Sequence, residues 1–159
     1  MPIDLLQAEQ EFVHTATTII NKVADQYKIP RPAIQYVGKR SSRAFCYYMP
    51  NGTSKISFGF NLWHRVETAM LHEMAHAVSW YFMRERGHDE GFQRTLKGIV
   101  RWWYNGDESK YQWDMEYVSV AASAGVEHSW RAKQRESAIN SFVRCGMDRA
   151  KAEKLVDEQ

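Results

Sequence analysis

His72-Glu73-Met74-Ala75-His76 is the stretch that decides how the rest of this 159-residue chain is interpreted. It lies in a run from about residue 65 to 83 whose apolar residues recur at helical spacing, which predicts a helix. Residues four apart in a helix lie on one face, about 6 Å apart along the axis. His72 and His76 can therefore direct two imidazoles at one metal ion, and the carboxylate of Glu73 lies beside the same site.

His88 is the predicted third ligand. It stands where the helix of His72 and His76 gives way to a second helix, for which Asp89 is a candidate N-terminal residue. A two-helix hairpin of this length can bring His88 back onto the first helix. Downstream carboxylates remain alternative third ligands: Glu90, Glu108 and Glu116.

Two histidines, a third protein ligand and a neighbouring carboxylate are the parts of a zinc peptidase site. One Zn²⁺ ion so held keeps a position for water and lowers the pKa of that water, and Glu73 would take the proton and pass it on. The metzincin spacing does not fit, because Ser79 and Phe82 stand where that pattern has glycine and histidine. The plain alternative is a surface helix with two solvated histidines.

Length and composition predict one main domain with a helical appendage, divided as residues 1–104 and 105–159. Net charge is only +2, which by itself does not require a nucleic-acid partner. Cys46 and Cys145 form no disulfide framework, and we expect a reducing, cytoplasmic environment. No signal peptide and no membrane span is expected from the apolar pattern.

The periodicities predict an α+β fold. An N-terminal helix, a three-stranded antiparallel sheet, the helix of the two histidines and a following helix make up the core. The expected helices cover residues 4–27, 65–83 and 89–103, with further helices at 127–144 and 148–156. The expected strands cover residues 33–37, 43–49 and 55–60, with a turn at 50–53.

Residues 56–61, 66–77 and 87–92 resemble the SprT-like zinc metalloproteases, the family that includes Spartan. The resemblance extends over about residues 5–103 and implies a zincin-like minimal metalloprotease core. It also implies that His72, His76 and His88 bind zinc and that Glu73 is the catalytic acid/base. Members of the family cut proteins, some of them proteins crosslinked to DNA. Many add a four-cysteine zinc ribbon, which the two cysteines of this chain cannot build.

The sequence therefore predicts a zinc-dependent endopeptidase acting on protein or peptide substrates, of a size that suits a bacterial or phage-encoded protein. One alternative is a nucleic-acid- or protein-binding module that keeps the zinc site without protease activity. Another is a non-enzymatic inhibitor that reuses the fold. The basic C-terminal helices are a candidate DNA contact or an ordinary solvated face. An edge strand is the predicted substrate-binding element, formed by Lys55, Ile56, Ser57, Phe58, Gly59 and Phe60.

Overall fold

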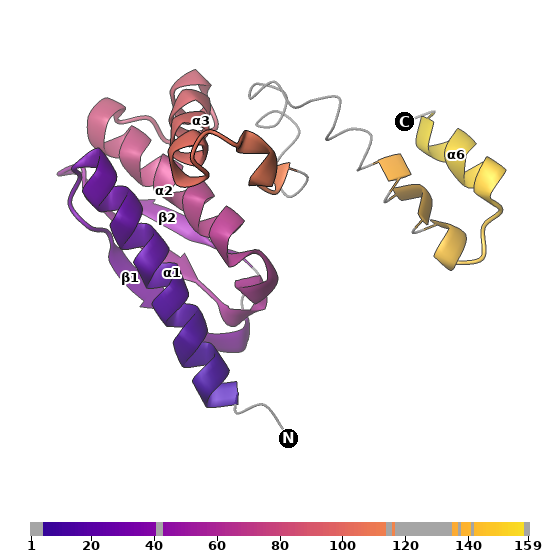
Figure 1. The fold of residues 1–159 in the computed structure, drawn as a ribbon, viewed down its shortest axis with the longest axis horizontal. Helices are drawn as coiled ribbons and strands as arrows, with labels where there is room; N and C mark the ends of the chain where they lie inside the picture. Colours follow the sequence, from indigo (N-terminus) through magenta and orange to yellow (C-terminus); the bar gives the residue numbers. More distant parts are fainter. Residues whose placement is uncertain are drawn as a thin grey trace. The chain divides into compact units, whose positions relative to one another are not determined.

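The computed structural model describes residues 5–40, 43–113, 116, 135–136, 138–140 and 142–157 (Figure 1). The chain divides into two compact units, Met1–Gln112 and Trp113–Gln159, where the sequence suggested a division after residue 104. The first unit contains three helices, α1 (Leu5–Tyr27), α2 (Val66–Met83) and α3 (Glu90–Trp103), and three strands, β1 (Ala33–Tyr36), β2 (Phe45–Tyr48) and β3 (Ser54–Phe58). The coarse α+β class is thus confirmed.

Helix α1 supplies one side of the core because its apolar residues recur at helical spacing. The buried residues on this stripe are Phe12, Ala16, Ile19, Ile20, Val23 and Ala24. The helix ends where Lys28 adopts a left-handed conformation, with φ of 56°, and Pro30 follows two residues later. Asp4, the first residue of the predicted helix 4–27, lies outside the described residues.

The three strands form a mixed sheet with the order β1-β3-β2, so the prediction of a fully antiparallel sheet was wrong. Strand β2 pairs with β3 in the antiparallel direction through the expected tight turn. In that turn the amide of Gly52 donates to the carbonyl oxygen of Met49 at 3.0 Å, and Gly52 has φ of 90°. Strand β1 instead runs parallel to β3. The alternation of apolar residues predicts a strand but not its partner or its direction.

Strand β3 is the central strand, which corrects the prediction that residues 55–60 form an edge. Its main chain pairs with β1 on one side and with β2 on the other. Four of its five residues are buried, Ser54 and Ser57 among them. A peptide therefore cannot pair with this strand at the described positions, because the hydrogen-bonding groups are already used.

Helices α1 and α2 pack on the same face of the sheet. Phe12 of α1 lies 5.7 Å from the ring of Phe58 in β3, and Trp80 of α2 lies 5.2 Å from the ring of Tyr48 in β2, measured between ring centroids. The inward residues occupy every second position, as strand geometry requires. This two-layer arrangement leaves the odd-numbered positions of all three strands on the opposite, outer face.

The loop between α2 and α3 begins where the sequence predicts the end of the helix over residues 65–83. Helix α2 ends at Met83, and Arg84 takes a left-handed conformation with φ of 56°. Helix α3 starts as predicted: the side chain of Asp89 accepts a hydrogen bond from the amide of Phe92 at 3.0 Å. This N-cap satisfies a backbone donor that has no partner within the helix and fixes the point at which His88 leaves the loop.

The second unit contains helix α6 (Arg149–Asp157), preceded by Asp148, whose carboxylate accepts from the amide of Lys151 at 3.3 Å. The predicted last helix and its cap are therefore present. Most of the region predicted as a helix at 127–144 lies outside the described residues. The same is true of most of residues 111–124, whose mixed periodicity fits either a strand or a helix. No described helix has the length and apolar character needed to cross a membrane.

Candidate metal centre

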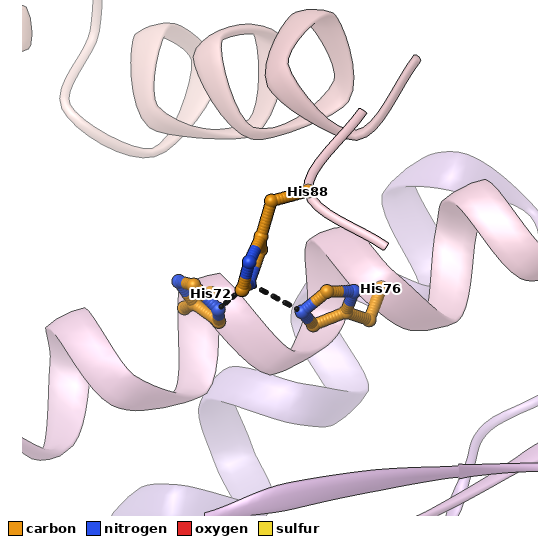
Figure 2. Close-up of side chains that lie close together, drawn as sticks. All are labelled: His72, His76 and His88. Carbon is orange, nitrogen blue, oxygen red and sulfur yellow. Dashed lines mark hydrogen bonds between the residues drawn. The ribbon is translucent and has the colours of Figure 1, made fainter. Parts of the chain in front are cut away.

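His72 and His76 lie one turn apart on α2, as their spacing requires (Figure 2). Their ring centroids are 5.0 Å apart. His76 is buried, and His72 is partly exposed. The helix thus presents both imidazoles on one face, with one ring closed off by the core and the other nearer to solvent.

His88 reaches the same point from the loop before α3 (Figure 2). Its Nε2 atom lies 3.1 Å from Nε2 of His72 and 3.2 Å from Nε2 of His76. Its main-chain carbonyl oxygen accepts a hydrogen bond from Nε2 of Gln93 at 2.9 Å, which holds the end of the loop against α3. The structure therefore brings together the three histidines that the sequence singled out.

The separation of the three nitrogens fits a small tetrahedral metal ion. Zinc–nitrogen bonds of about 2.0–2.1 Å at tetrahedral angles place neighbouring ligand nitrogens about 3.3 Å apart. The observed separations between Nε2 of His88 and its two neighbours, 3.1 and 3.2 Å, are close to that value. Among the described residues, the group with metal-ligating side chains close enough to hold an ion consists of His72, His76 and His88.

The environment of His76 keeps its ring neutral, which is the form that binds a metal. Burial, followed by the neighbouring charges of His72 and His88, lowers the pKa of His76 to about 3. Its Nδ1 atom is buried and has no hydrogen-bond partner among the described residues. Metal-bound histidines usually have their second nitrogen fixed by a hydrogen bond, so ring packing has to orient this one.

Phe92 provides that packing. Its ring stacks on His76 with centroids 4.3 Å apart and an interplanar angle of 27°. The same ring lies 5.1 Å from His72 and 4.9 Å from His88. Phe92 is fully buried, so one aromatic side chain forms a rigid support in contact with all three imidazoles.

Glu73 is buried, with 8% of its surface exposed, and its charge acts on strand β2. Burial first, and the Glu73 carboxylate second, raise the pKa of Cys46 to about 12. The pKa of Tyr48 is also raised, chiefly by burial and with a contribution from Glu73. Glu73 is thus buried on the helix that carries His72 and His76, and its charge affects two side chains on the inward face of β2.

The alternative ligands do not join this group. Glu90 is exposed in the first turn of α3, and Glu108 pairs with Arg101 at 3.3 Å. Glu116 is buried, and the group of described side chains close enough to share an ion does not include it. The predicted substrate strand, residues 55–60, is not an edge strand: residues 55–58 belong to the central strand β3, and Phe60 begins the short 3₁₀ helix Phe60–Arg65.

Sequence reasoning missed two residues of the site. Phe92 was expected only as part of an apolar stripe, although it follows His88 by four positions and so lies beside it at the start of a helix. Tyr48 was expected only as a strand residue, yet its ring centroid lies 6.3 Å from that of His76. No local pattern reveals Tyr48, because its role depends on which strand flanks α2.

Comparison of the chain with models of protein families, with curated proteins and with solved structures gives no match.

Proposed function

We propose that this protein is a zinc-dependent endopeptidase similar to the SprT-like metalloproteases. The observation that supports the proposal is the convergence of three imidazole nitrogens, with Nε2 of His88 at 3.1 and 3.2 Å from those of His72 and His76. Three histidines leave a fourth coordination position open, whereas structural zinc sites are usually closed by four protein ligands. An open position suits catalysis better than a purely structural role.

Zinc bound at this site would supply Lewis acidity and lower the pKa of a water molecule beside the peptide carbonyl. Glu73 would accept the proton from that water and deliver it to the departing amine. Its burial on α2, close to the histidines in sequence, excludes most competing solvent. Phe92 would keep the imidazoles in place throughout, because its own ring is packed on every side.

The free edge of β2 is the proposed binding site for the substrate main chain. Among the described strands, β2 pairs only with β3. The amide of Met49 donates to Thr53 across the hairpin at 3.0 Å, so by antiparallel alternation the amides of Cys46 and Tyr48 point to the free edge. An extended peptide could pair there with little demand on its sequence, next to His76 and Glu73.

DNA is a proposed partner with weaker support at the C-terminal helices. Arg135 forms a two-bond ion pair with Asp157, with nitrogen–oxygen distances of 2.7 and 3.0 Å. Arg149 pairs with Glu136 at 2.9 Å and with Glu153 at 3.0 Å. These ion pairs neutralise two of the basic side chains for which this segment was a candidate DNA contact. They favour the alternative that these helices present an ordinary solvated surface. We also propose that the protein acts in the cytoplasm.

Replacement of Glu73 by glutamine tests the proposed function. Glutamine has nearly the same shape but cannot accept the proton, so we expect cleavage of an unfolded protein substrate to fall by about 10²–10⁴-fold. Zinc content, measured by mass spectrometry of the purified protein, should remain at one ion per chain. Both assays should be run with and without DNA.

Glu11→Gln is the matched control, because Glu11 is exposed on α1 and the change is chemically identical. It should leave both zinc content and cleavage unchanged. If the zinc-loaded wild-type protein cuts no substrate with or without DNA, the peptidase proposal is wrong. The protein would then be a binding module that keeps the zinc site. If Glu73→Gln cuts as fast as the wild type, another group is the base.

A further inference from the structure

Two arginines of the loop after α2 lie over the ring of Trp80, but they differ in what else they bind. The guanidinium carbon of Arg84 is 5.4 Å from the centroid of that ring, and the guanidinium carbon of Arg86 is 4.9 Å from it. Nη1 of Arg84 donates to the main-chain carbonyl oxygens of Trp80 and Tyr81 at 2.9 and 2.7 Å. Arg84 therefore satisfies carbonyl groups at the end of α2, which have no partners within the helix.

The side chain of Arg86, by contrast, contacts aromatic rings. Besides Trp80, its guanidinium carbon lies 5.9 Å from the ring centroid of Tyr48. Arg86 is exposed, and among the described residues no oxygen accepts a hydrogen bond from its guanidinium. A guanidinium over a ring uses its face, whereas its five N–H donors lie in its plane. The donors of Arg86 are therefore available to an anion from outside the chain.

The surroundings of Arg86 hold it beside the metal centre. Its main-chain carbonyl oxygen accepts a hydrogen bond from the hydroxyl group of Tyr48, and the Tyr48 ring in turn lies 6.3 Å from the ring of His76. Trp80 is buried, and its Nε1 donates to the carbonyl oxygen of Met49 at 2.8 Å. Because two fixed rings support the guanidinium, less freedom is lost when it binds a ligand.

The free edge of β2 would place a substrate side chain next to this arginine. The amide of Tyr48 points to that edge, as described above. Directly opposite residues of two paired strands have their side chains on the same face, with Cβ atoms about 4.5–5.5 Å apart. A substrate residue opposite Tyr48 would therefore extend along the Tyr48 ring, on the side of the sheet where Arg86 lies.

We propose that Arg86 is a specificity-determining residue, which selects an aspartate or glutamate side chain at the substrate position opposite Tyr48. A carboxylate matches the paired donors of a guanidinium, and such charge-assisted hydrogen bonds are stronger than neutral ones. A lysine or arginine at the same substrate position would meet a like charge. The inference rests on the proposed peptidase function and names its substrate class: extended protein segments that carry an acidic side chain.

The acidic residues of the same loop do not occupy this site. Asp89 caps α3 through its hydrogen bond from the amide of Phe92. Oε2 of Glu85 occupies the space in which a side chain at Gly91 would begin. Both carboxylates thus lie at the start of α3, and among the described residues neither is paired with Arg86. A carboxylate of the substrate therefore has no described competitor from the chain itself.

Cleavage of a denatured protein substrate by the full chain, with the cut bonds mapped by mass spectrometry, is the first test. We expect aspartate and glutamate to be enriched at one fixed position relative to the cut bond. A peptide with such a site is then compared with a partner that has glutamine in place of the acidic residue. The acidic peptide should have a kcat/KM about three- to tenfold higher, and the difference should shrink as salt rises.

Reversal of the charge at Arg86 separates recognition from a structural role. Arg86→Gln should make the two peptides equally good substrates. Arg86→Glu should invert the preference, so that lysine at that position is favoured over glutamine, a result that a loosened loop would not produce. Arg31→Gln is the matched control, because Arg31 is exposed and already paired with Asp25 at 2.8 Å. It should keep the wild-type preference, and zinc content and thermal melting verify each variant.

Peptide binding to zinc-loaded Glu73→Gln protein distinguishes failure of this inference from failure of the proposed function. Fluorescence anisotropy compares an unstructured glutamine-rich peptide with versions in which single glutamines are exchanged for glutamate. Tighter binding of an acidic version, lost on adding Arg86→Gln, supports the site even if the wild type cuts nothing. The inference is overturned, with the peptidase intact, if cleavage occurs but glutamate and glutamine are equivalent at every position. A preference that survives in Arg86→Gln and Arg86→Glu also overturns it.

Discussion

The hydroxyl group of Tyr48 donates a hydrogen bond to the main-chain carbonyl oxygen of Arg86 at 2.9 Å. This contact ties edge strand β2 to the loop that presents His88, across 38 residues of sequence. A tyrosine hydroxyl is protonated at neutral pH at its ordinary pKa, and burial raises the pKa of Tyr48 further, so this group is a donor. The position of His88 is therefore determined partly by this hydrogen bond from strand β2.

Tyr48→Phe should loosen that loop. One exposed or half-buried hydrogen bond contributes about 1 kcal/mol, so we expect zinc affinity, measured by competition with a chelator, to fall by about twofold to tenfold. Tyr47→Phe removes the neighbouring hydroxyl from the outer face and is the control. Equal affinity in wild type and Tyr48→Phe would show that α3 alone positions His88.

His88→Ala should remove zinc binding almost completely. Loss of a ligand should exceed the roughly 10- to 100-fold effect of losing a group that only orients one. His14→Ala alters an exposed histidine of α1 and should retain one ion per chain. Retention of stoichiometric zinc by His88→Ala would assign the third ligand to a carboxylate, with Glu90 and Glu108 the first to replace.

Gly91 and Glu85 should be energetically coupled. A Cβ atom at Gly91 would lie 1.8 Å from Oε2 of Glu85, so alanine there must displace the carboxylate from the start of α3. Alanine otherwise favours a helix over glycine by about 0.8–1.0 kcal/mol. We expect Gly91→Ala to stabilise the protein in a Glu85→Ala background and to stabilise it less, or destabilise it, in the wild type.

Chemical denaturation of the four proteins in this cycle gives the coupling energy directly. The zinc affinity of each should also be measured, because Glu85 and Gly91 flank the loop of His88. Additive effects within about 0.3–0.5 kcal/mol would mean that the carboxylate moves aside freely and does not hold the loop.

Cys46 should resist alkylation while Cys145 reacts. Burial and the charge of Glu73 raise the pKa of Cys46 to about 12, and only the thiolate reacts. At pH 8 about one molecule in 10⁴ would carry the thiolate form at this position, whereas Cys145 is exposed. Because the shift is upward, protection should persist below pH 9 and weaken as the pH rises towards 12.

Peptide mapping after a timed exposure to iodoacetamide measures the two rates separately. Denatured protein, in which both thiols are solvated, is the reference for complete reaction. Comparable rates for the two cysteines in the folded protein would place Cys46 in a more open environment than the inner face of β2.

Helices α1, α2, α3 and α6 and the three histidines followed from sequence because each depends on short-range spacing. His72 and His76 lie one turn apart, and Asp89 caps α3 directly after His88. The parallel pairing of β1 could not be foreseen in this way. Residues 37–44 are short enough for a hairpin between β1 and β2, yet β3 lies between those strands.

The edge-strand prediction was wrong for a related reason. The alternation of Ile56 and Phe58 with Lys55 and Ser57 is typical of a strand with one solvated face. Ser57 is nevertheless buried, because it lies in the central strand, between Gln35 of β1 and Phe45 of β2. The order of the strands depends on contacts across the whole sheet, which local sequence does not reveal. The positions of Phe92 and Tyr48 beside the histidines depend on tertiary contacts of the same kind.

Strand β2 places consecutive side chains on opposite surfaces. Cys46 and Tyr48 face the helix of Glu73, while Phe45 and Tyr47 face outward. With the turn after Met49 fixed, insertion of one residue between Tyr48 and Met49 would exchange the two sets. Such an insertion would turn the Tyr48 ring away from His76 and from the carbonyl of Arg86, and it would remove Phe45 and Tyr47 from the outer face at once. The number of residues between the turn and Tyr48 therefore decides both surfaces together.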